Sequence, residues 1–206
     1  MVETVVVGLR RPRAGDPSVE VELDSGERVR VHDRRLPEHG LAVGASLDPA
    51  SHAALVRAGA ADAAERRSLG LIARRPRSRA ELSRRMREWG IPREDAAQVL
   101  ERLREMGVLD DAALASAIVS SRRARSYGRL RIASELARLE VDPDVSSALA
   151  ETSAYAEVDR ARAALGSRYS AHTGDPADLR RAAQFLSRRG FDSDTVAAAL
   201  GFDDAC

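Results

Sequence analysis

Helical segments recur along this chain at an offset of 50 residues, and this repeat limits the folds that the chain can adopt. The segments LSRRMREWGI (82–91), IASELARLEV (132–141) and AAQFLSRRGF (182–191) place apolar residues at matching positions. The matched sets are Leu82, Ile132 and Ala182; Met86, Leu136 and Leu186; and Ile91, Val141 and Phe191. Helical units that recur at a fixed period bury their apolar faces against their neighbours. The repeat therefore predicts a mainly α fold, in which tandem three-helix repeats form an elongated, curved body.

Each repeated segment lies between two further apolar helices. The preceding helices lie around residues 69–73, 114–119 and 158–165, and the following ones end at Val99-Leu100, Ala148-Leu149 and Ala199-Leu200. We therefore expect three three-helix units, over residues 63–109, 110–153 and 154–206. Aromatic residues make up only 3% of the chain, so the core must consist mainly of aliphatic side chains, a mixture that favours packing of helix on helix.

Residues 1–62 predict a small β-rich N-terminal extension with a short helix. VETVVVGL is β-branched, and SVEVEL and RVRVHD alternate apolar and charged residues around the turn 24–27. This pattern is typical of a small sheet with one solvated face. Asp48-Pro49 then predicts a helix N-terminus, because aspartate caps and proline suits the first helical position. We expect Gly59 to end this helix.

Local signals mark the helix ends in the repeats. Ser78-Arg79-Ala80-Glu81 has the form of a capping box, in which the hydroxyl and the carboxylate satisfy free backbone N–H groups. Gly90 and Gly190 stand where a helix would end in a left-handed residue, whereas the middle unit has Glu140 there. Asp110 and Asp111 suit a helix N-terminus, where carboxylates complement the helix dipole. A catalytic role would need a further acid or a histidine nearby, and none is evident in the sequence.

Composition excludes several classes of protein. Cys206 is the only cysteine, which excludes an intramolecular disulfide, and the four histidines (His32, His39, His52 and His172) lack metal-ligand spacing. The N-terminus does not resemble a secretory signal, and no segment approaches the roughly 18 apolar residues of a membrane span. We therefore expect a cytoplasmic, monomeric protein that is not an enzyme, with no catalytic residues, metal, cofactor, small-molecule substrate or membrane contact.

Charge is distributed unevenly along the chain. All 33 basic residues are arginine, which reflects either compositional drift or a need for planar guanidinium groups that suit phosphates and carboxylates. Residues 1–62 carry a net charge of −2, residues 63–138 carry +8 and residues 139–206 carry −5. The near-neutral total of +1 therefore hides a strongly basic central part.

Two dense groups of arginines lie in this basic part. Within residues 66–87 the only acid is Glu81, and within residues 120–138 it is Glu135. Such clusters are typical of a surface that follows phosphates, although a solvated helix face is the plainer interpretation. Tyr127 either stacks on a base or packs a loop, and Trp89 is expected in the core. The candidate contact residues are Arg74, Arg75, Arg77, Arg79, Arg84, Arg85, Arg122, Arg123, Arg125, Tyr127, Arg129 and Arg131.

Several ordered motifs resemble the RecX family of recombination regulators. They are the RPRS-x-x-EL stretch from residue 75, the G-x-LDD turn with the A-x-x-x-V helix after it, and the R-x-x-x-x-x-GRLRI-x-x-EL segment from Arg122. The resemblance covers residues 63–150 strongly and the third unit more loosely, and residues 1–62 resemble an N-terminal β extension that some members carry. Two positions depart from the family pattern: Leu114 replaces a frequent aromatic residue, and Glu140 replaces the usual glycine.

The resemblance implies tandem three-helix units and a function without chemistry of its own. Members bind the RecA recombinase in the groove of its filament on DNA and restrain its ATPase, strand-exchange and coprotease activities, and some also bind DNA directly. Two other classes remain open from the residues alone. One is a general nucleic-acid-binding helical-repeat protein without a recombinase partner, and the other is a scaffold for an unrelated acidic protein.

Overall fold

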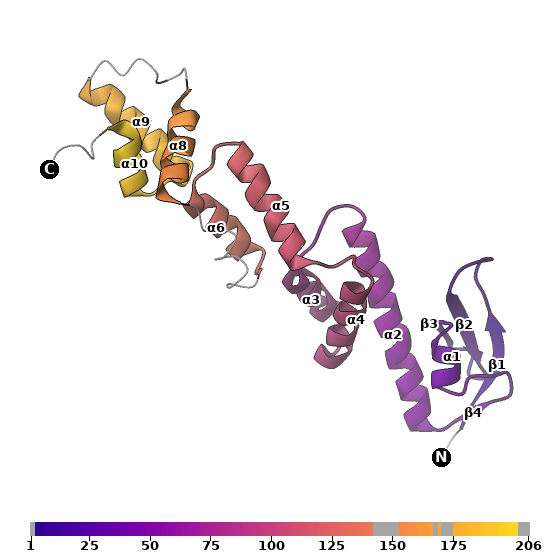
Figure 1. The fold of residues 1–206 in the computed structure, drawn as a ribbon. Helices are drawn as coiled ribbons and strands as arrows, with labels where there is room; N and C mark the ends of the chain where they lie inside the picture. Colours follow the sequence, from indigo (N-terminus) through magenta and orange to yellow (C-terminus); the bar gives the residue numbers. More distant parts are fainter. Residues whose placement is uncertain (1–2, 142–152, 167–168, 170–174, 202–206) are drawn as a thin grey trace. The chain divides into compact units, whose positions relative to one another are not determined.

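The computed structural model describes residues 3–141, 153–166, 169 and 175–201, and helices dominate it after an N-terminal sheet (Figure 1). The chain divides into two compact units. Unit 1 comprises residues 1–77 and 82–109, and unit 2 comprises residues 78–81 and 110–206. The predicted mainly α fold with a small N-terminal sheet is confirmed. The curved, elongated body stays a prediction.

The N-terminal strands form one antiparallel sheet in the order β3-β2-β1-β4. Valines meet directly across β2 and β3, in the pairs Val19 with Val31 and Val21 with Val29. All four side chains are buried, and Val21, Val29 and Val31 share a core with Leu55. The charged residues between them face outward, so the alternation in the sequence produced the expected half-buried sheet. The strands are β1 (Thr4–Arg10), β2 (Ser18–Leu23), β3 (Arg28–His32) and β4 (Ser46–Leu47), and the short helix α1 (Arg35–Glu38) follows β3.

One long helix, α2 (Pro49–Ile72), packs on the sheet. Its N-terminus was predicted correctly, because the Asp48 side chain accepts the Ser51 N–H at 2.7 Å. The expected end at Gly59 was wrong, since the helix continues for another 13 residues to Ile72. Gly59 serves close packing instead: a Cβ there would lie 2.6 Å from Val29 Cγ1. The boundary expected at residue 62 therefore falls inside a continuous helix.

The second half of α2 forms a helical core with α3 (Arg79–Glu88) and α4 (Arg93–Glu105). Leu82 and Met86 are buried, as the repeat predicted, and Trp89 packs against the same core. The helix expected to end at Val99-Leu100 continues to Glu105, which adds the buried Leu103 to this core. At the end of α3, Gly90 has a φ of 76°, the left-handed conformation that its position predicted.

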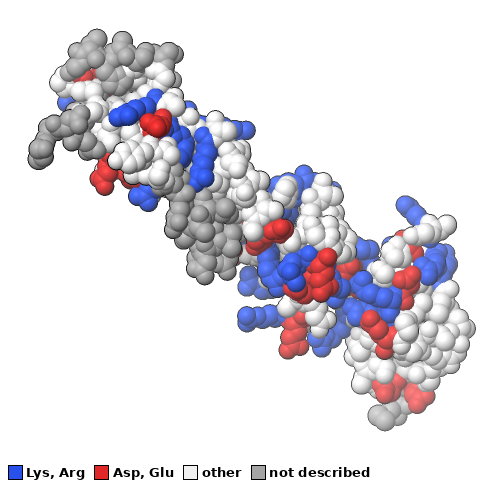
Figure 2. All heavy atoms as spheres, in the orientation of Figure 1, with Lys and Arg blue, Asp and Glu red and all other residues white. Residues whose placement is uncertain are grey.

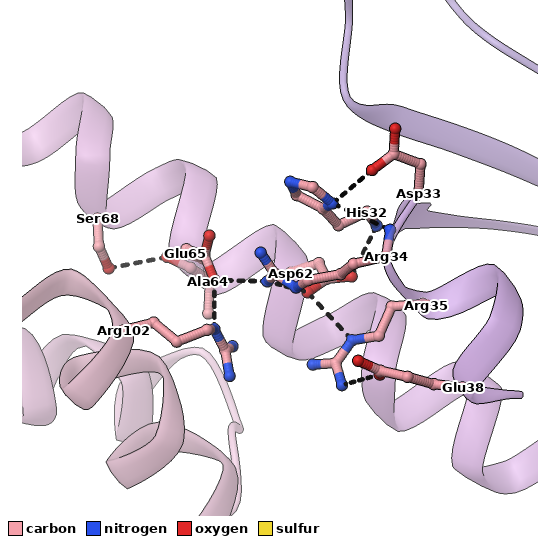
Figure 3. A network of polar contacts seen from close by, with 10 residues as sticks. All are labelled: His32, Asp33, Arg34, Arg35, Glu38, Asp62, Ala64, Glu65, Ser68 and Arg102. Atoms are coloured by element: carbon pink, nitrogen blue, oxygen red, sulfur yellow. Dashed lines mark hydrogen bonds and ion pairs between the residues drawn. The ribbon is translucent and has the colours of Figure 1, made fainter. Parts of the chain in front are cut away.

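Two buried carboxylates of α2 link the sheet, α2 and α4 within unit 1 (Figure 3). Asp62 is 2% exposed, accepts the His32 N–H at 2.7 Å and pairs with Arg34 at 3.2 Å. Glu65 is 7% exposed and accepts from Arg34 at 2.9 Å and from Arg102 of α4 at 2.8 Å. Arg34 thus bridges both acids, and the sheet is fixed to the helical core by charge-assisted hydrogen bonds.

Unit 2 begins with α5 (Asp111–Ala124) and α6 (Arg129–Arg138), which share a core of Ala115, Val119, Ile132, Leu136 and Val141. Asp110 accepts the Ala113 N–H at 2.9 Å, so the predicted helix cap is confirmed. Glu140 has a φ of 53°, the left-handed conformation for which the other repeats use glycine. The helix expected to end at Ala148-Leu149 lies outside the described residues.

Three further helices described in unit 2 form another core. They are α8 (Ala154–Leu165), α9 (Pro176–Arg188) and α10 (Ser193–Leu200). Ala182, Leu186 and Phe191 are buried in it, at the positions that the repeat predicted. No helix among the described residues has both the length and the apolar content to cross a membrane. The residue limits of the three predicted units stay a proposal.

Replacement of the two glycines of α2 by alanine should change the free energy of unfolding in opposite directions. Gly59→Ala should lower the free energy of unfolding by about 1–2 kcal/mol, because the added methyl group overpacks the contact with Val29. Gly70→Ala should raise it by about 0.5–1 kcal/mol, because the new Cβ would meet no atom within 4 Å beyond its chain neighbours and the helix's own backbone, and alanine is the better helix former. Denaturant titrations of both variants test this. Stabilisation by Gly59→Ala would contradict the close approach.

The Glu65 network predicts a specific loss of stability in acid. Burial raises the pKa of Glu65, but the hydrogen bonds from Arg102 and Arg34 outweigh it and hold this pKa below its ordinary value of 4.5. The carboxylate therefore contributes stability above about pH 4.5, and this contribution is lost as the pH falls through the lowered pKa. Glu65→Gln should cost about 1.5–3 kcal/mol at pH 7 and much less at pH 3.

Unfolding free energies measured between pH 3 and pH 7 test this difference. Glu94→Gln is the matched control, because Glu94 is an acid of the same unit with an 89% exposed side chain. Its curve should follow that of the wild type. A Glu65→Gln curve parallel to the wild type over the whole range would contradict the role of the network.

Candidate nucleic-acid interface

The candidate residues fall into two groups on the described structure. The first cluster consists of Arg74, Arg75, Arg77, Arg79, Arg84 and Arg85, in the α2–α3 connection and on α3. The second cluster consists of Arg122, Arg123, Arg125, Tyr127, Arg129 and Arg131, from the last turn of α5 to the first turn of α6. Most of the first cluster belongs to unit 1, and the second cluster belongs to unit 2.

The first cluster lies mostly on the surface. Arg74 and Arg75 are exposed after the end of α2, and Arg84 is exposed on α3. Arg85 pairs with Glu88 at 2.8 Å, and both side chains are 50% exposed, so solvent screens this pair. Figure 2 shows arginines and acids interspersed over the part of the molecule that holds the sheet and α2. The first cluster therefore presents cations to solvent, with Glu88 as an acidic neighbour of Arg85 on the same helix.

The start of α3 is held by two hydrogen bonds to its backbone. The Ser78 hydroxyl accepts the Glu81 N–H at 3.1 Å, which confirms this half of the predicted capping box. The Arg79 N–H donates to the Asp111 carboxylate at 2.8 Å, within the residues assigned to unit 2. Both acceptors satisfy free N–H groups at the helix start, and the Asp111 carboxylate also complements the positive end of the helix dipole. They fix the backbone that carries Arg77 and Arg79.

Two arginines of the second cluster are held by acids of the same unit. Arg122 forms a bidentate pair with Glu135, with both N···O distances 2.6 Å. This pair raises the pKa of Arg122 and lowers that of Glu135. The Arg129 guanidinium donates to Asp192 at 2.8 Å, which raises the pKa of Arg129. The backbone N–H of Arg129 donates to Glu157 at 2.7 Å. These two guanidinium groups therefore have a structural role, whatever else they contact.

Tyr127 packs against two arginines of its own chain. The guanidinium carbon of Arg131 lies 4.8 Å from the ring centroid, and that of Arg189 lies 5.3 Å from it. Arg189 Nη1 also donates to the carbonyls of Arg125 at 2.9 Å and Ser126 at 3.3 Å. Cations on an aromatic face gain about 0.5–1 kcal/mol or more each. The geometry favours the loop-packing interpretation of Tyr127 over a free ring that stacks on a base.

Arg189 is the residue that sequence reasoning missed, because it lies in the acidic third segment. The repeat contained a signal for it. Trp89 and Leu139 occupy the equivalent positions and pack against their cores, so an arginine in that register indicates a different environment. Trp89 itself was placed correctly, and Arg67 lies over its ring at 5.5 Å. Arg189 also lies over the Phe185 ring at 4.8 Å, so a cation lies over an aromatic ring near the end of both α3 and α9.

The described residues contain no group of three or more His, Cys, Asp and Glu side chains that could hold a metal ion. The carboxylates that lie close together, such as Asp62 and Glu65, are occupied by arginines. The arginines of the two clusters can bind anions, because guanidinium groups donate in a planar fork that matches phosphate and carboxylate oxygens.

Comparisons with known proteins give two family matches and several relatives. The model described as RecX, first three-helix domain, matches residues 64–103, and that of RecX, second three-helix domain, matches residues 110–148. A regulatory protein RecX of Xanthomonas oryzae pv. oryzae (strain MAFF 311018) is 38% identical over 140 residues, which cover 66% of this chain and 86% of that protein. One of Stenotrophomonas maltophilia (strain R551-3) is 35% identical over 139 residues, with 66% and 85% covered.

Two solved structures share the fold. One, described as regulatory protein RecX, has a TM-score of 0.73 at 20% identity and covers 96% of this chain and 98% of its own. The other, RecX from Lactobacillus salivarius, has a TM-score of 0.59 at 19% identity, with 70% and 97% covered. The first of these likenesses extends over almost the whole chain.

Proposed function

Because this chain belongs to the RecX family, we propose that it binds the RecA recombinase and its filament on DNA and inhibits the ATPase, strand-exchange and coprotease activities of that filament. The observation that carries the proposal is the similarity to regulatory proteins RecX over most of their length. The protein acts by binding alone, as a cytoplasmic monomer without a cofactor. It acts on the recombinase without catalysing a reaction of its own.

The exposed arginines supply the contacts in this proposal. Arg74, Arg75 and Arg84 are exposed in the first cluster, and Arg125 and Arg131 are exposed in the second. A filament on DNA offers phosphates and acidic side chains at every subunit, and guanidinium groups bind both. Because the clusters lie in different compact units, one molecule can make several weak contacts at once. Multivalent contact then favours the filament over free recombinase.

Inhibition at low stoichiometry is the test of this function. Titration of the protein into RecA on single-stranded DNA should slow ATP hydrolysis and strand exchange at far fewer copies than recombinase subunits, because each bound molecule restrains several of them. No effect at equimolar protein would refute the proposal. Equal affinity for naked DNA and filament, with a steep loss as salt rises, would instead support a general nucleic-acid-binding protein.

The first cluster should contribute to inhibition. Replacing Arg74, Arg75 and Arg77 together by alanine should raise the half-inhibitory concentration by about tenfold or more, because several charge-assisted contacts are lost. The control replaces Arg28, Arg93 and Arg104, three exposed arginines of the same unit outside the cluster, and should leave inhibition nearly unchanged. Circular dichroism should show equal helicity in both variants. Unchanged inhibition by the first variant would make the cluster a solvated surface.

A further inference from the structure

Two guanidinium groups from different helical segments converge on Tyr127. Arg131 comes from the first turn of α6 and Arg189 from the end of α9, and both guanidinium carbons lie within 5.3 Å of the centroid of the same ring. Tyr127 and Arg189 are half-buried and Arg131 is exposed. The tertiary fold thus brings two cations to one aromatic ring near the surface, although the residues are 58 positions apart in sequence.

The acids around this position are engaged by other groups. Glu135 is held by Arg122 through both carboxylate oxygens. Asp192 accepts from Arg129 and from the Thr195 N–H. Among the described residues, neither Arg131 nor Arg189 forms an ion pair with a carboxylate. Two cations on one ring without a direct counter-charge repel each other, and bound anions relieve this repulsion.

A backbone contact fixes the two arginines relative to each other. The Gly128 N–H donates to the Arg189 carbonyl at 2.9 Å, and the Leu130 N–H donates to the Gly190 carbonyl at 3.0 Å. A Cβ on Gly128 would collide with the Gly190 carbonyl, and Gly190 has a φ of 87°. The two glycines therefore let the start of α6 and the end of α9 touch directly. The backbone segments that carry the two arginines are therefore held in place before any ligand binds, which lowers the entropy cost of binding.

We propose that Arg131 and Arg189, held over Tyr127, form a composite site for the phosphate groups of a nucleic-acid strand. A nucleic-acid strand carries a charged phosphate at every nucleotide, so successive phosphates offer oxygens to two separate guanidinium groups, each of which donates in a planar fork that matches them. Tyr127 already has arginines on its ring, so the site binds the backbone without stacking a base. The site adds a specific nucleic-acid contact to the proposed function, and its role at the filament rests on that function.

Salt-dependent binding of a single-stranded oligonucleotide, measured by fluorescence anisotropy with the full chain, tests the site. Arg131→Ala should weaken binding by about tenfold and reduce the slope of log K against log salt by about 0.7, the value for one phosphate contact on a single strand. Arg131→Lys should keep the slope, because it keeps the charge, but should not restore full affinity, because it lacks the fork.

Arg180→Ala is the matched control. Arg180 is an exposed arginine of α9, so its removal changes the net charge equally without touching the site. This variant should keep nearly all of the affinity and the slope. Equal behaviour of Arg131→Ala and Arg180→Ala would overturn the proposal, as would a wild-type protein that does not bind the oligonucleotide at low salt.

Inhibition of the RecA ATPase by the same variants separates this site from the proposed function. If Arg131→Ala loses inhibition but keeps the DNA slope, the site contacts the recombinase, and the phosphate proposal fails while the function stands. If Arg131→Ala loses the DNA slope and the wild-type protein does not inhibit RecA, the phosphate site stands and the function fails. Unchanged thermal unfolding of the variant ensures that neither result comes from loss of the fold.

Discussion

Unit 1 depends on the close approach of α2 to the sheet. Gly59 has no side chain, so the helix backbone lies directly on Val29, and the buried carboxylates of Asp62 and Glu65 then reach the arginines beyond it. One continuous helix therefore serves both the sheet core and the first helical core. The N-terminal extension is held by packing and by paired charges, so it is part of the unit that carries most of the first arginine cluster.

The repeat predicted the helical cores well because burial in a helix follows a local period. Leu82, Ile132 and Ala182 are all buried, although nothing but their spacing identified them. Gly59 was misinterpreted because a glycine that ends a helix and one that allows close packing look alike in sequence. Only the position of Val29, 30 residues earlier, distinguishes the two cases, and such long-range contacts leave no local signal.

The candidate surface was only partly predictable for the same reason. Arginine density located both clusters, but it did not separate arginines that face solvent from those held by acids. Arg122 finds its partner 13 residues away, and Arg129 finds Asp192 at a distance of 63 residues. Summing charge by segment also assigned Arg189 to an acidic region, whereas the fold brings it to Tyr127 in the basic one. Net charge along the chain is therefore a weaker guide than charge on the folded surface.

The absence of lysine has structural consequences whatever its origin. Arg34 contacts Asp62 and Glu65 at once, and Arg189 donates to two carbonyls while its planar group lies over Tyr127. A lysine ammonium is a compact charge with no flat face, so it cannot make this combination of contacts. The same planar fork that organises the interior also suits phosphate oxygens. Interior pairs and surface contacts thus draw on one side-chain chemistry, and burial and available acids decide which role each arginine takes.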